Sequence, residues 1–121
     1  MSGVWIAVCG SDELLDGEQG VRFEWTRDDG LPPEAAFVIR YAGTAHAYLN
    51  RCGHVPVELD WLEGSFFDTQ ATYLVCATHG ALYAPESGHC MAGPCAGRGL
   101  VRLPCREADG RIWVGAPAVR A

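Results

Sequence analysis

Two short segments of the chain each combine a cysteine with a histidine, two side chains that bind transition metals. Cys52 and His54 stand in the first segment and Cys76 and His79 in the second, with 21 residues between His54 and Cys76. Two thiolates and two imidazoles together make a complete four-ligand set. The sequence therefore predicts one metal centre built from two loops.

The spacing within each segment bears on which metal is bound. All four side chains could hold one tetrahedral zinc ion, or the cysteines could hold one iron and the histidines the other iron of a two-iron, two-sulfur cluster. Structural zinc sites usually leave about two to four residues between paired ligands, whereas only Gly53 separates Cys52 from His54. So short a gap strains chelation of one small ion but suits ligands of two different irons, which favours the cluster.

Both segments lie where a strand-like run enters a loop that contains glycine or proline. Gly53 and Gly80 let the backbone come close, so that amide N–H groups can bond to the sulfurs of a cluster. Loops that project from a rigid sheet are a common place for a binding site.

The rest of the sequence consists mostly of short runs rich in β-branched and aromatic residues, separated by turn signals such as "DDGLPP", "AGTA" and "EADG". The expected strands are Val4–Val8, Val21–Trp25, Ala35–Tyr41, Ala45–Asn50, Ala71–Cys76, Leu100–Cys105 and Arg111–Gly115. Leu14–Gln19 and Val57–Leu62 could each form one helical turn, too short to be stable without tertiary support. We expect an all-β fold, either an antiparallel sandwich or a small barrel.

Composition limits the class of protein. The 121 residues suit one domain, 49% are hydrophobic, and the formal net charge is −6. No basic stripe could neutralise phosphates, which argues against nucleic acid and favours a partner with a basic face. No apolar run approaches the roughly 20 residues that a bilayer requires, and the acidic N-terminal region lacks a secretory signal. We expect a cytoplasmic protein with reduced cysteines and no membrane partner.

The two segments together, "CGH" and "CATHG", resemble the Rieske signature, and the flanking "AYLNRCGHVPVELDW", "LVCATHGALYAPESGHCMAGPC" and "GRIWV" resemble small bacterial Rieske ferredoxins over roughly Val4 to Val114. The resemblance implies a single Rieske domain over residues 1–121, with a small subdomain of cluster-binding loops at about 50–60 and 74–95. It implies that Cys52 and Cys76 bind one iron of a 2Fe-2S cluster and that His54 and His79 bind the other. Pro94 would belong to the third loop, which covers the cluster.

Two departures from the family pattern bear on the reduction potential. High-potential members carry one further cysteine in each segment, joined as a disulfide, where this chain has Val57 and Ala77–Thr78. They also place a serine where Ala81 stands, so one hydroxyl donor to a cluster sulfur is missing, whereas Tyr83 retains the usual aromatic. Because hydrogen bonds to the sulfurs raise the potential, we expect the low end of the Rieske range, roughly −150 mV.

The resemblance implies an electron carrier and not an enzyme, since a cluster bound by four protein ligands has no open coordination position. The expected partners are a flavin-dependent reductase and an oxygenase, such as a ring-hydroxylating dioxygenase. One alternative is the small subunit of an assimilatory nitrite reductase. Another is a structural or interaction module stabilised by zinc.

Other reactive side chains have simpler interpretations. We expect Cys90 and Cys95 to be loop thiols, with a disulfide or a second metal site including His89 as alternatives. Cys9 and Cys105 suit small buried positions. His46 is expected within a strand and His89 in an exposed turn.

Trp61 could shield the cluster or simply pack in the core. Glu58 and Asp60 lack a basic partner nearby in sequence and make a poor general acid/base pair. A solvated turn is the simplest interpretation of the acidic residues Asp12, Glu13, Asp16 and Glu18.

Overall fold

The computed structural model describes residues 4–25, 33–51, 58–60, 64–76, 80–93 and 99–116. Within these segments the chain forms ten β-strands and one turn of 3-10 helix, η1 (Ser11–Glu13), which confirms the all-β prediction. The strands are β1 (Val4–Gly10), β2 (Val21–Trp25), β3 (Glu34–Tyr41), β4 (Thr44–Leu49), β5 (Leu74–Val75), β6 (Leu82–Tyr83), β7 (Cys90–Ala92), β8 (Arg102–Leu103), β9 (Cys105–Ala108) and β10 (Arg111–Ala116).

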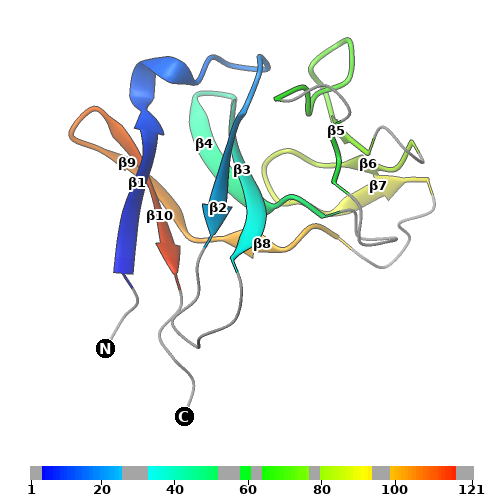
Figure 1. Cartoon of the computed structure of the whole chain (residues 1–121). Coiled ribbons are helices and arrows are strands. Elements are labelled where there is room, and N and C mark those ends of the chain that lie inside the picture. The colour runs from blue at the N-terminus through cyan, green and yellow to red at the C-terminus, as the bar shows by residue number, and fades with distance from the viewer. Residues whose placement is uncertain are drawn as a thin grey trace.

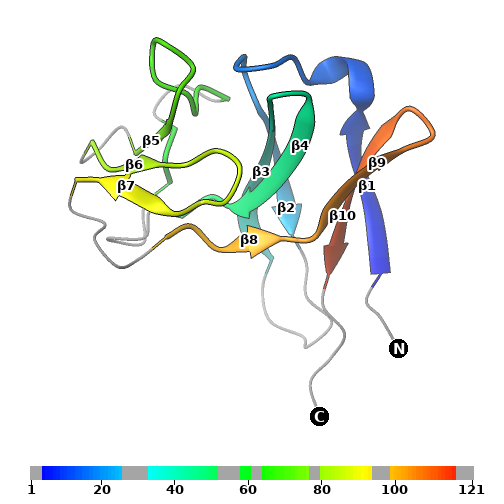
Figure 2. The ribbon, with the colours of Figure 1, turned by 180° about the vertical axis from the view of Figure 1, so that it is seen from behind.

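The strands form three antiparallel sheets, shown from opposite sides in Figures 1 and 2. The first sheet has the order β1-β10-β9, the second β2-β3-β4-β8, and the small third sheet β5-β6-β7. The second sheet lies between the other two in both views. The first two sheets therefore make the sandwich, and the third sheet belongs to the loops of the predicted metal centre.

Each face of the second sheet contributes to a hydrophobic core. The sandwich core consists of Leu14, Trp25, Ala36, Val38, Ala45, Ala47, Leu49, Leu103, Ile112 and Val114. The loop core consists of Phe37, Ile39, Tyr48, Leu59, Phe66, Leu74, Cys76, Ala81, Tyr83 and Leu100. Successive side chains of a strand point to opposite faces, so β3 gives alternate residues to the two cores. This is why its sequence, "AAFVI", is continuously apolar and does not alternate.

Two hairpins confirm the turn signals in the sequence. Ala42 and Gly43 join β3 to β4 with φ values of 52° and 83°, and Asp109 and Gly110 join β9 to β10 with φ values of 56° and 72°. Two successive positive φ values are typical of the two-residue turns that match the twist of antiparallel strands. These turns fix the register of both hairpins.

Arg40 ties the second sheet to the first. Its guanidinium donates two hydrogen bonds of 2.9 Å to the carboxylate of Glu107 on β9. It also donates to the carbonyl oxygens of Leu14 (2.8 Å), Ser11 (3.1 Å) and Gly43 (3.1 Å). The hydrogen bonds from Arg40 lower the pKa of Glu107 to about 2. This bidentate pair therefore joins β3 of the second sheet to β9 of the first.

Three sequence predictions about local structure were wrong. The expected strand Ala71–Cys76 shrinks to Leu74–Val75, because Asp68 Oδ1 accepts hydrogen bonds from the Thr72 and Tyr73 amides and holds those residues in a turn.

The expected strand Leu100–Cys105 divides into β8 and β9 at Pro104, which has no N–H to donate to a ladder. The helical turn expected at Leu14–Gln19 is absent. The chain instead turns at Ser11–Glu13, where Glu13 Oε2 accepts a 2.7 Å hydrogen bond from the Gly10 amide, and Leu14 is already extended. Of Val57–Leu62, residues 58–60 are not helical and the others lie outside the described residues.

Candidate metal centre

The second cysteine–histidine segment begins at the end of β5. Cys76 has no exposed surface, and it belongs to the loop core. Its amide donates to the carbonyl of Ala81 (2.9 Å), and its carbonyl accepts from the amide of Gly80 (2.7 Å). Gly80 has φ +73°, which lets the chain reverse into β6. These two hydrogen bonds bring Gly80 and Ala81 against Cys76, and His79 lies outside the described residues.

The third loop of the expected site begins against this second segment. A Cβ atom added to Gly93 would lie 2.9 Å from Ala81 Cα and 3.3 Å from the Gly80 carbonyl oxygen. Only a glycine fits so close to another backbone, and its φ of +91° also favours glycine. Gly93 therefore lies directly against Gly80 and Ala81. Pro94 lies outside the described residues.

The first segment is held at its two ends. Asn50 follows β4, and its side-chain amide donates a 3.0 Å hydrogen bond to Asp60 Oδ1. Asn50 Oδ1 accepts from the amide of Leu59 (2.9 Å), and Asp60 Oδ2 accepts from the amide of Gly64 (2.9 Å). Residues 50 and 60 therefore meet. Cys52, Gly53 and His54 stand between them in the sequence and lie outside the described residues.

The expectation that Glu58 and Asp60 lack a basic partner was wrong. Arg22 of β2 lies 2.7 Å from Glu58 Oε1 and 3.6 Å from Asp60 Oδ2. The sequence alone did not reveal this partner because 36 residues separate Arg22 from Glu58. Asn50 was also missed as a site residue, and the only available signal was a polar residue directly ahead of "RCGH". Arg22 and Asn50 both support the loop and offer no acid/base chemistry.

The surroundings of Cys76 fit a soft metal cofactor. A buried thiol at a strand end, next to a glycine turn with room for close backbone approach, is the environment that a cluster ligand requires. Leu74, Phe66 and Tyr83 are fully buried in the same core and exclude water from that side of the thiol. In the described segments no three potential ligands cluster, and three of the four predicted ligands lie outside them.

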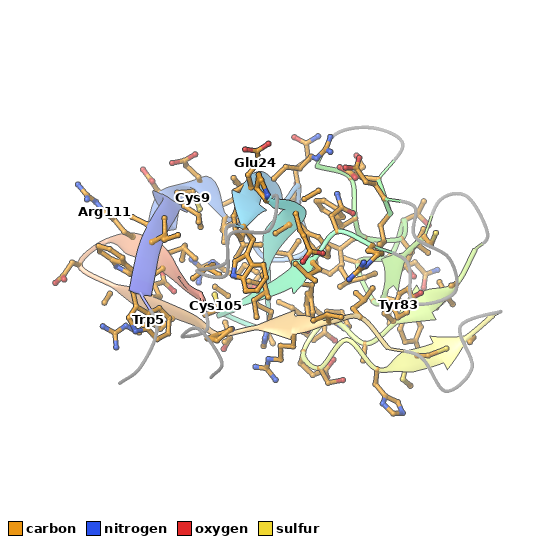
Figure 3. All side chains as sticks on the ribbon, turned by 60° about the horizontal axis from the view of Figure 1, so that its bottom comes forward. Trp5, Cys9, Glu24, Tyr83, Cys105 and Arg111 are labelled. Atoms are coloured by element: carbon orange, nitrogen blue, oxygen red, sulfur yellow. The ribbon has the colours of Figure 1, made fainter. Side chains whose placement is uncertain are left out.

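Ala81 and Tyr83, which we expect beside the cluster, are both fully buried. The methyl group of Ala81 brings no hydroxyl to this turn. Tyr83, labelled in Figure 3, lies on β6 and pairs with Leu74 of β5 on one side and Cys90 of β7 on the other.

Cys90 differs from the expectation that it is a loop thiol. It is disulfide-bonded and not a free thiol, and its partner lies outside the described residues. Its Sγ lies 3.9 Å from the Ala92 carbonyl oxygen, a van der Waals contact because a disulfide sulfur carries no hydrogen. Cys9 and Cys105 are free and half-buried, and burial raises the pKa of both thiols to about 11. Figure 3 shows both at the end of the molecule opposite Tyr83.

The two histidines of the described residues behave as expected. His46 is buried on β4, where burial and the nearby charge of Arg102 lower its pKa, and its Nδ1 has no hydrogen-bond partner. His89 is exposed and follows a turn. The acidic side chains Asp12, Glu13, Asp16 and Glu18 are exposed, as predicted for a solvated turn. Trp61 lies outside the described residues.

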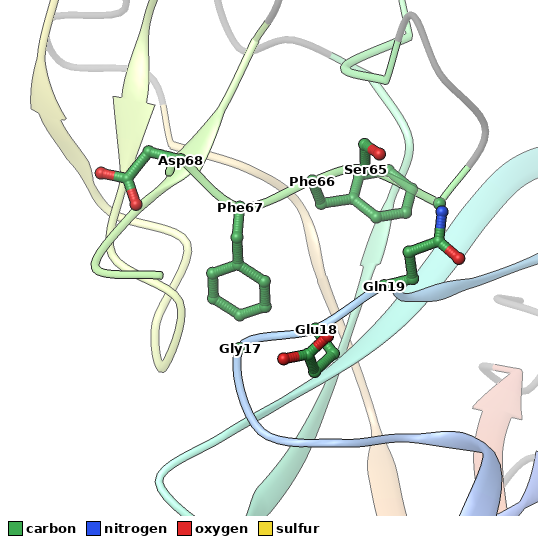
Figure 4. Close-up of a pocket in the computed structure, with 8 residues that line it drawn as sticks. Gly17, Glu18, Gln19, Ser65, Phe66, Phe67 and Asp68 are labelled. Carbon is green, nitrogen blue, oxygen red and sulfur yellow. The ribbon is translucent and has the colours of Figure 1, made fainter. Parts of the chain in front are cut away.

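An open pocket of about 180 Å³ lies beside the first loop, between positions 17–19 and 64–68 (Figure 4). Its charged lining side chains are Glu18 and Asp68, and Asp68 already caps a turn. Gly64 is shared by the pocket and the hydrogen bonds around Asp60. The lining therefore has two carboxylates and no basic side chain.

Comparisons with known proteins agree on one family. A family model described as the Rieske [2Fe-2S] domain matches residues 4–107. The fold is similar to the Sphingomonas yanoikuyae B1 ferredoxin, with a TM-score of 0.70 and 20% identity over 94% of this chain and 100% of that one. It is also similar to the ferredoxin of carbazole 1,9a-dioxygenase from Nocardioides aromaticivorans IC177, with a TM-score of 0.69 and 19% identity over 93% and 98% of the two chains.

The chain also matches part of a larger protein. The terminal oxygenase of carbazole 1,9a-dioxygenase from Nocardioides aromaticivorans IC177 gives a TM-score of 0.71 and 20% identity over 96% of this chain, but only 31% of that one. The sequence has no significant match among curated proteins. In the described part of the chain, no helix has the length and hydrophobicity to cross a membrane.

Proposed function

Since the chain belongs to the Rieske [2Fe-2S] domain family, we propose that it carries single electrons from a flavin-dependent reductase to an oxygenase or a similar terminal oxidoreductase. The family's 2Fe-2S cluster, when bound, takes up one electron and gives it back. We place this exchange in the cytoplasm, with proteins as the only partners.

We assign the four ligands from the two segments. Cys52 and Cys76 hold one iron through their thiolates, and His54 and His79 hold the other through their imidazoles. The observation that carries the proposal is that the family match spans both segments, residues 52–54 and 76–79. With every ligand position filled by the protein, no position is left for a substrate.

The near-complete overlap with ferredoxin chains supports a carrier. The chain aligns with 98% to 100% of the two ferredoxins and with 31% of the terminal oxygenase. In that oxygenase the same fold is one part of a longer chain. The extent of this chain therefore matches that of the ferredoxins and not that of the oxygenase.

The described residues prepare the site in three ways. The Cys76–Ala81 hydrogen bond holds the thiol at the end of β5, and Gly80 and Gly93 bring two backbone segments together. The buried side chains around Cys76 keep water from the thiol on the core side. Ala81 supplies no hydroxyl, which supports a potential near the low end of the Rieske range, roughly −150 mV.

Metal analysis and spectroscopy test the proposal. The purified protein should be red-brown, contain about two irons per chain, and give the low average g-value of a Rieske centre when reduced. Cys52→Ser and His79→Ala should each lose this signal, whereas His89→Ala should keep it. A colourless protein with one zinc per chain would establish the zinc-stabilised module instead.

Electron transfer tests the partners. Because the net charge is −6, reduction by a flavin-dependent reductase with a basic docking face should slow as salt increases from 50 to 500 mM, ionic strengths chosen to span strong to weak screening. A rate that does not change with salt would contradict electrostatic steering. Rapid oxidation of the reduced protein by an oxygenase, but not by a nitrite reductase, would separate the two carrier roles.

A further inference from the structure

The first loop is closed by a pair of buried polar side chains. Asn50 is 3% exposed and Asp60 is 7% exposed, and the carboxylate side chain of Asp60 has no exposed surface. We call these two side chains, with their hydrogen bonds to the amides of Leu59 and Gly64, the clasp. Asn50 has both side-chain groups bonded, and each carboxylate oxygen of Asp60 accepts one bond.

A buried polar pair costs more free energy than is needed simply to close a loop. A buried carboxylate loses its hydration, and an apolar pair of the same volume often stabilises a fold as well or better. Arg22 compensates the charge only from 3.6 Å, and its shorter contact is with the exposed Glu58. The clasp instead provides a defined orientation, because its three hydrogen bonds fix how the chain runs at residues 50 and 60.

The clasp also joins the first loop to the base of the second. Leu59, whose amide bonds to Asn50, is fully buried in the loop core together with Cys76 and Ala81. Asn50 is anchored on the other side, because its amide donates a 2.8 Å hydrogen bond to the carbonyl of Ala35 on β3. One end of the first loop is therefore anchored to β3, and the other end packs in the core that contains Cys76.

We propose that Asn50 and Asp60 are positioning residues for the metal centre: the clasp sets where the first loop presents Cys52 and His54 relative to Cys76. This inference rests on the proposed function, since it assumes that the first loop supplies ligands. Asn50 and Asp60 touch no reacting atom in this role. They act through the backbone of the loop that they close.

The hydrogen-bond pattern allows an exchange test. Asp60→Asn leaves one oxygen for two donors, the Asn50 amide and the Gly64 N–H, so one donor loses its partner. Asn50→Asp places a second carboxylate at the 3.0 Å contact with Asp60. The double exchange Asn50→Asp/Asp60→Asn restores all three bonds with the donor and acceptor reversed. Glu58→Gln is the matched control, because it removes one negative charge from the same loop without touching the clasp.

Three measurements are made on each purified protein: iron per chain, the g-values of the reduced state, and the midpoint potential. We expect each single variant to hold less than half the iron of the wild type and to have shifted g-values. The reduction equilibrium should shift about tenfold, or ~59 mV, upward in Asp60→Asn, which removes one negative charge. It should stay closer to the wild-type value in Asn50→Asp, because two buried carboxyl groups 3.0 Å apart share one proton. The double exchange should regain the iron content and g-values, and Glu58→Gln should never lose them.

The outcomes are distinct. Single variants with wild-type iron content and g-values overturn the clasp as a positioning device, even if their potentials move with charge as in Glu58→Gln. If a single variant does not fold, the double exchange decides: a folded protein with altered g-values or low iron overturns the inference. A wild-type protein without a cluster overturns the proposed function as well, whereas a loaded wild type with unaffected variants overturns the clasp alone.

Discussion

Gly93→Ala tests most directly whether the third loop rests on the second ligand segment. The new methyl carbon would lie 2.9 Å from Ala81 Cα and 3.3 Å from the Gly80 carbonyl oxygen. These are backbone atoms in a loop closed by the hydrogen bonds between Cys76 and Ala81 and between Gly80 and Cys76. They cannot rotate aside as a side chain can, so the third loop must move away.

Gly43→Ala provides the control for backbone strain. Gly43 has φ +83°, close to the +91° of Gly93, but a Cβ atom there meets nothing within 4 Å. Left-handed backbone costs a non-glycine residue about 1–2 kcal/mol. Overpacking a close contact adds about 1–3 kcal/mol. We therefore expect the free energy of unfolding to fall by about 1–2 kcal/mol in Gly43→Ala and by about 2–5 kcal/mol in Gly93→Ala.

Urea unfolding followed by circular dichroism measures both losses. The rate at which a chelator removes iron gives a second readout, since only the displaced third loop should expose the centre. We expect faster iron loss in Gly93→Ala and a wild-type rate in Gly43→Ala. Equal stability losses together with equal rates of iron loss would refute the contact between Gly93 and the second segment.

Three further substitutions follow from single contacts. Ala81→Ser should raise the midpoint potential by tens of millivolts, because it supplies a hydroxyl donor; voltammetry that shows no rise contradicts this. Glu107→Gln should lower stability by about 1 kcal/mol at pH 7, a value reduced for solvent screening. Because the folded-state pKa of Glu107 is depressed from 4.5 to about 2 by the hydrogen bond from Arg40, this contribution is present above pH 4.5 and is lost as the pH falls towards 2, so melts of the two proteins should converge there. Tyr48→Phe removes a buried 2.6 Å hydrogen bond to the Pro85 carbonyl and should lower the free energy of unfolding by about 1–3 kcal/mol, whereas an unchanged urea midpoint would mean that water replaces it.

The features that the sequence predicted well are those encoded locally. Strand β2 begins and ends at the predicted residues, Val21–Trp25, because its alternation and its flanking turn signals are both local. The hairpin turns at Gly43 and Gly110 were likewise recognisable, since a left-handed position selects glycine. The two cysteine–histidine segments stand out because their residue types and spacing are unusual together, and their role as ligands is the proposal made above.

The features that the sequence did not predict depend on distant partners. In the sequence Asn50 and Asp60 look like ordinary polar residues, because only the fold buries them against each other. Arg22 reaches Glu58 across 36 positions of sequence, and no local pattern records that pairing. The disulfide at Cys90 was set aside because a cytoplasmic compartment favours thiols, which is an argument about surroundings and not about the distance between sulfurs.

The second sheet contributes to both cores, which explains why a small carrier needs a whole sandwich. Phe37 on β3 stacks on Phe66 at 3.9 Å between ring centroids, and Phe66 belongs to the same core as Cys76. The opposite face of β3 packs through Val38 into the sandwich core, which Arg40 and Glu107 help to close. A ligand loop can keep a fixed position only if the strand beneath it does not move. The sandwich therefore acts as the rigid support for the loop core, which depends on β3 and β4 for Phe37, Ile39 and Tyr48.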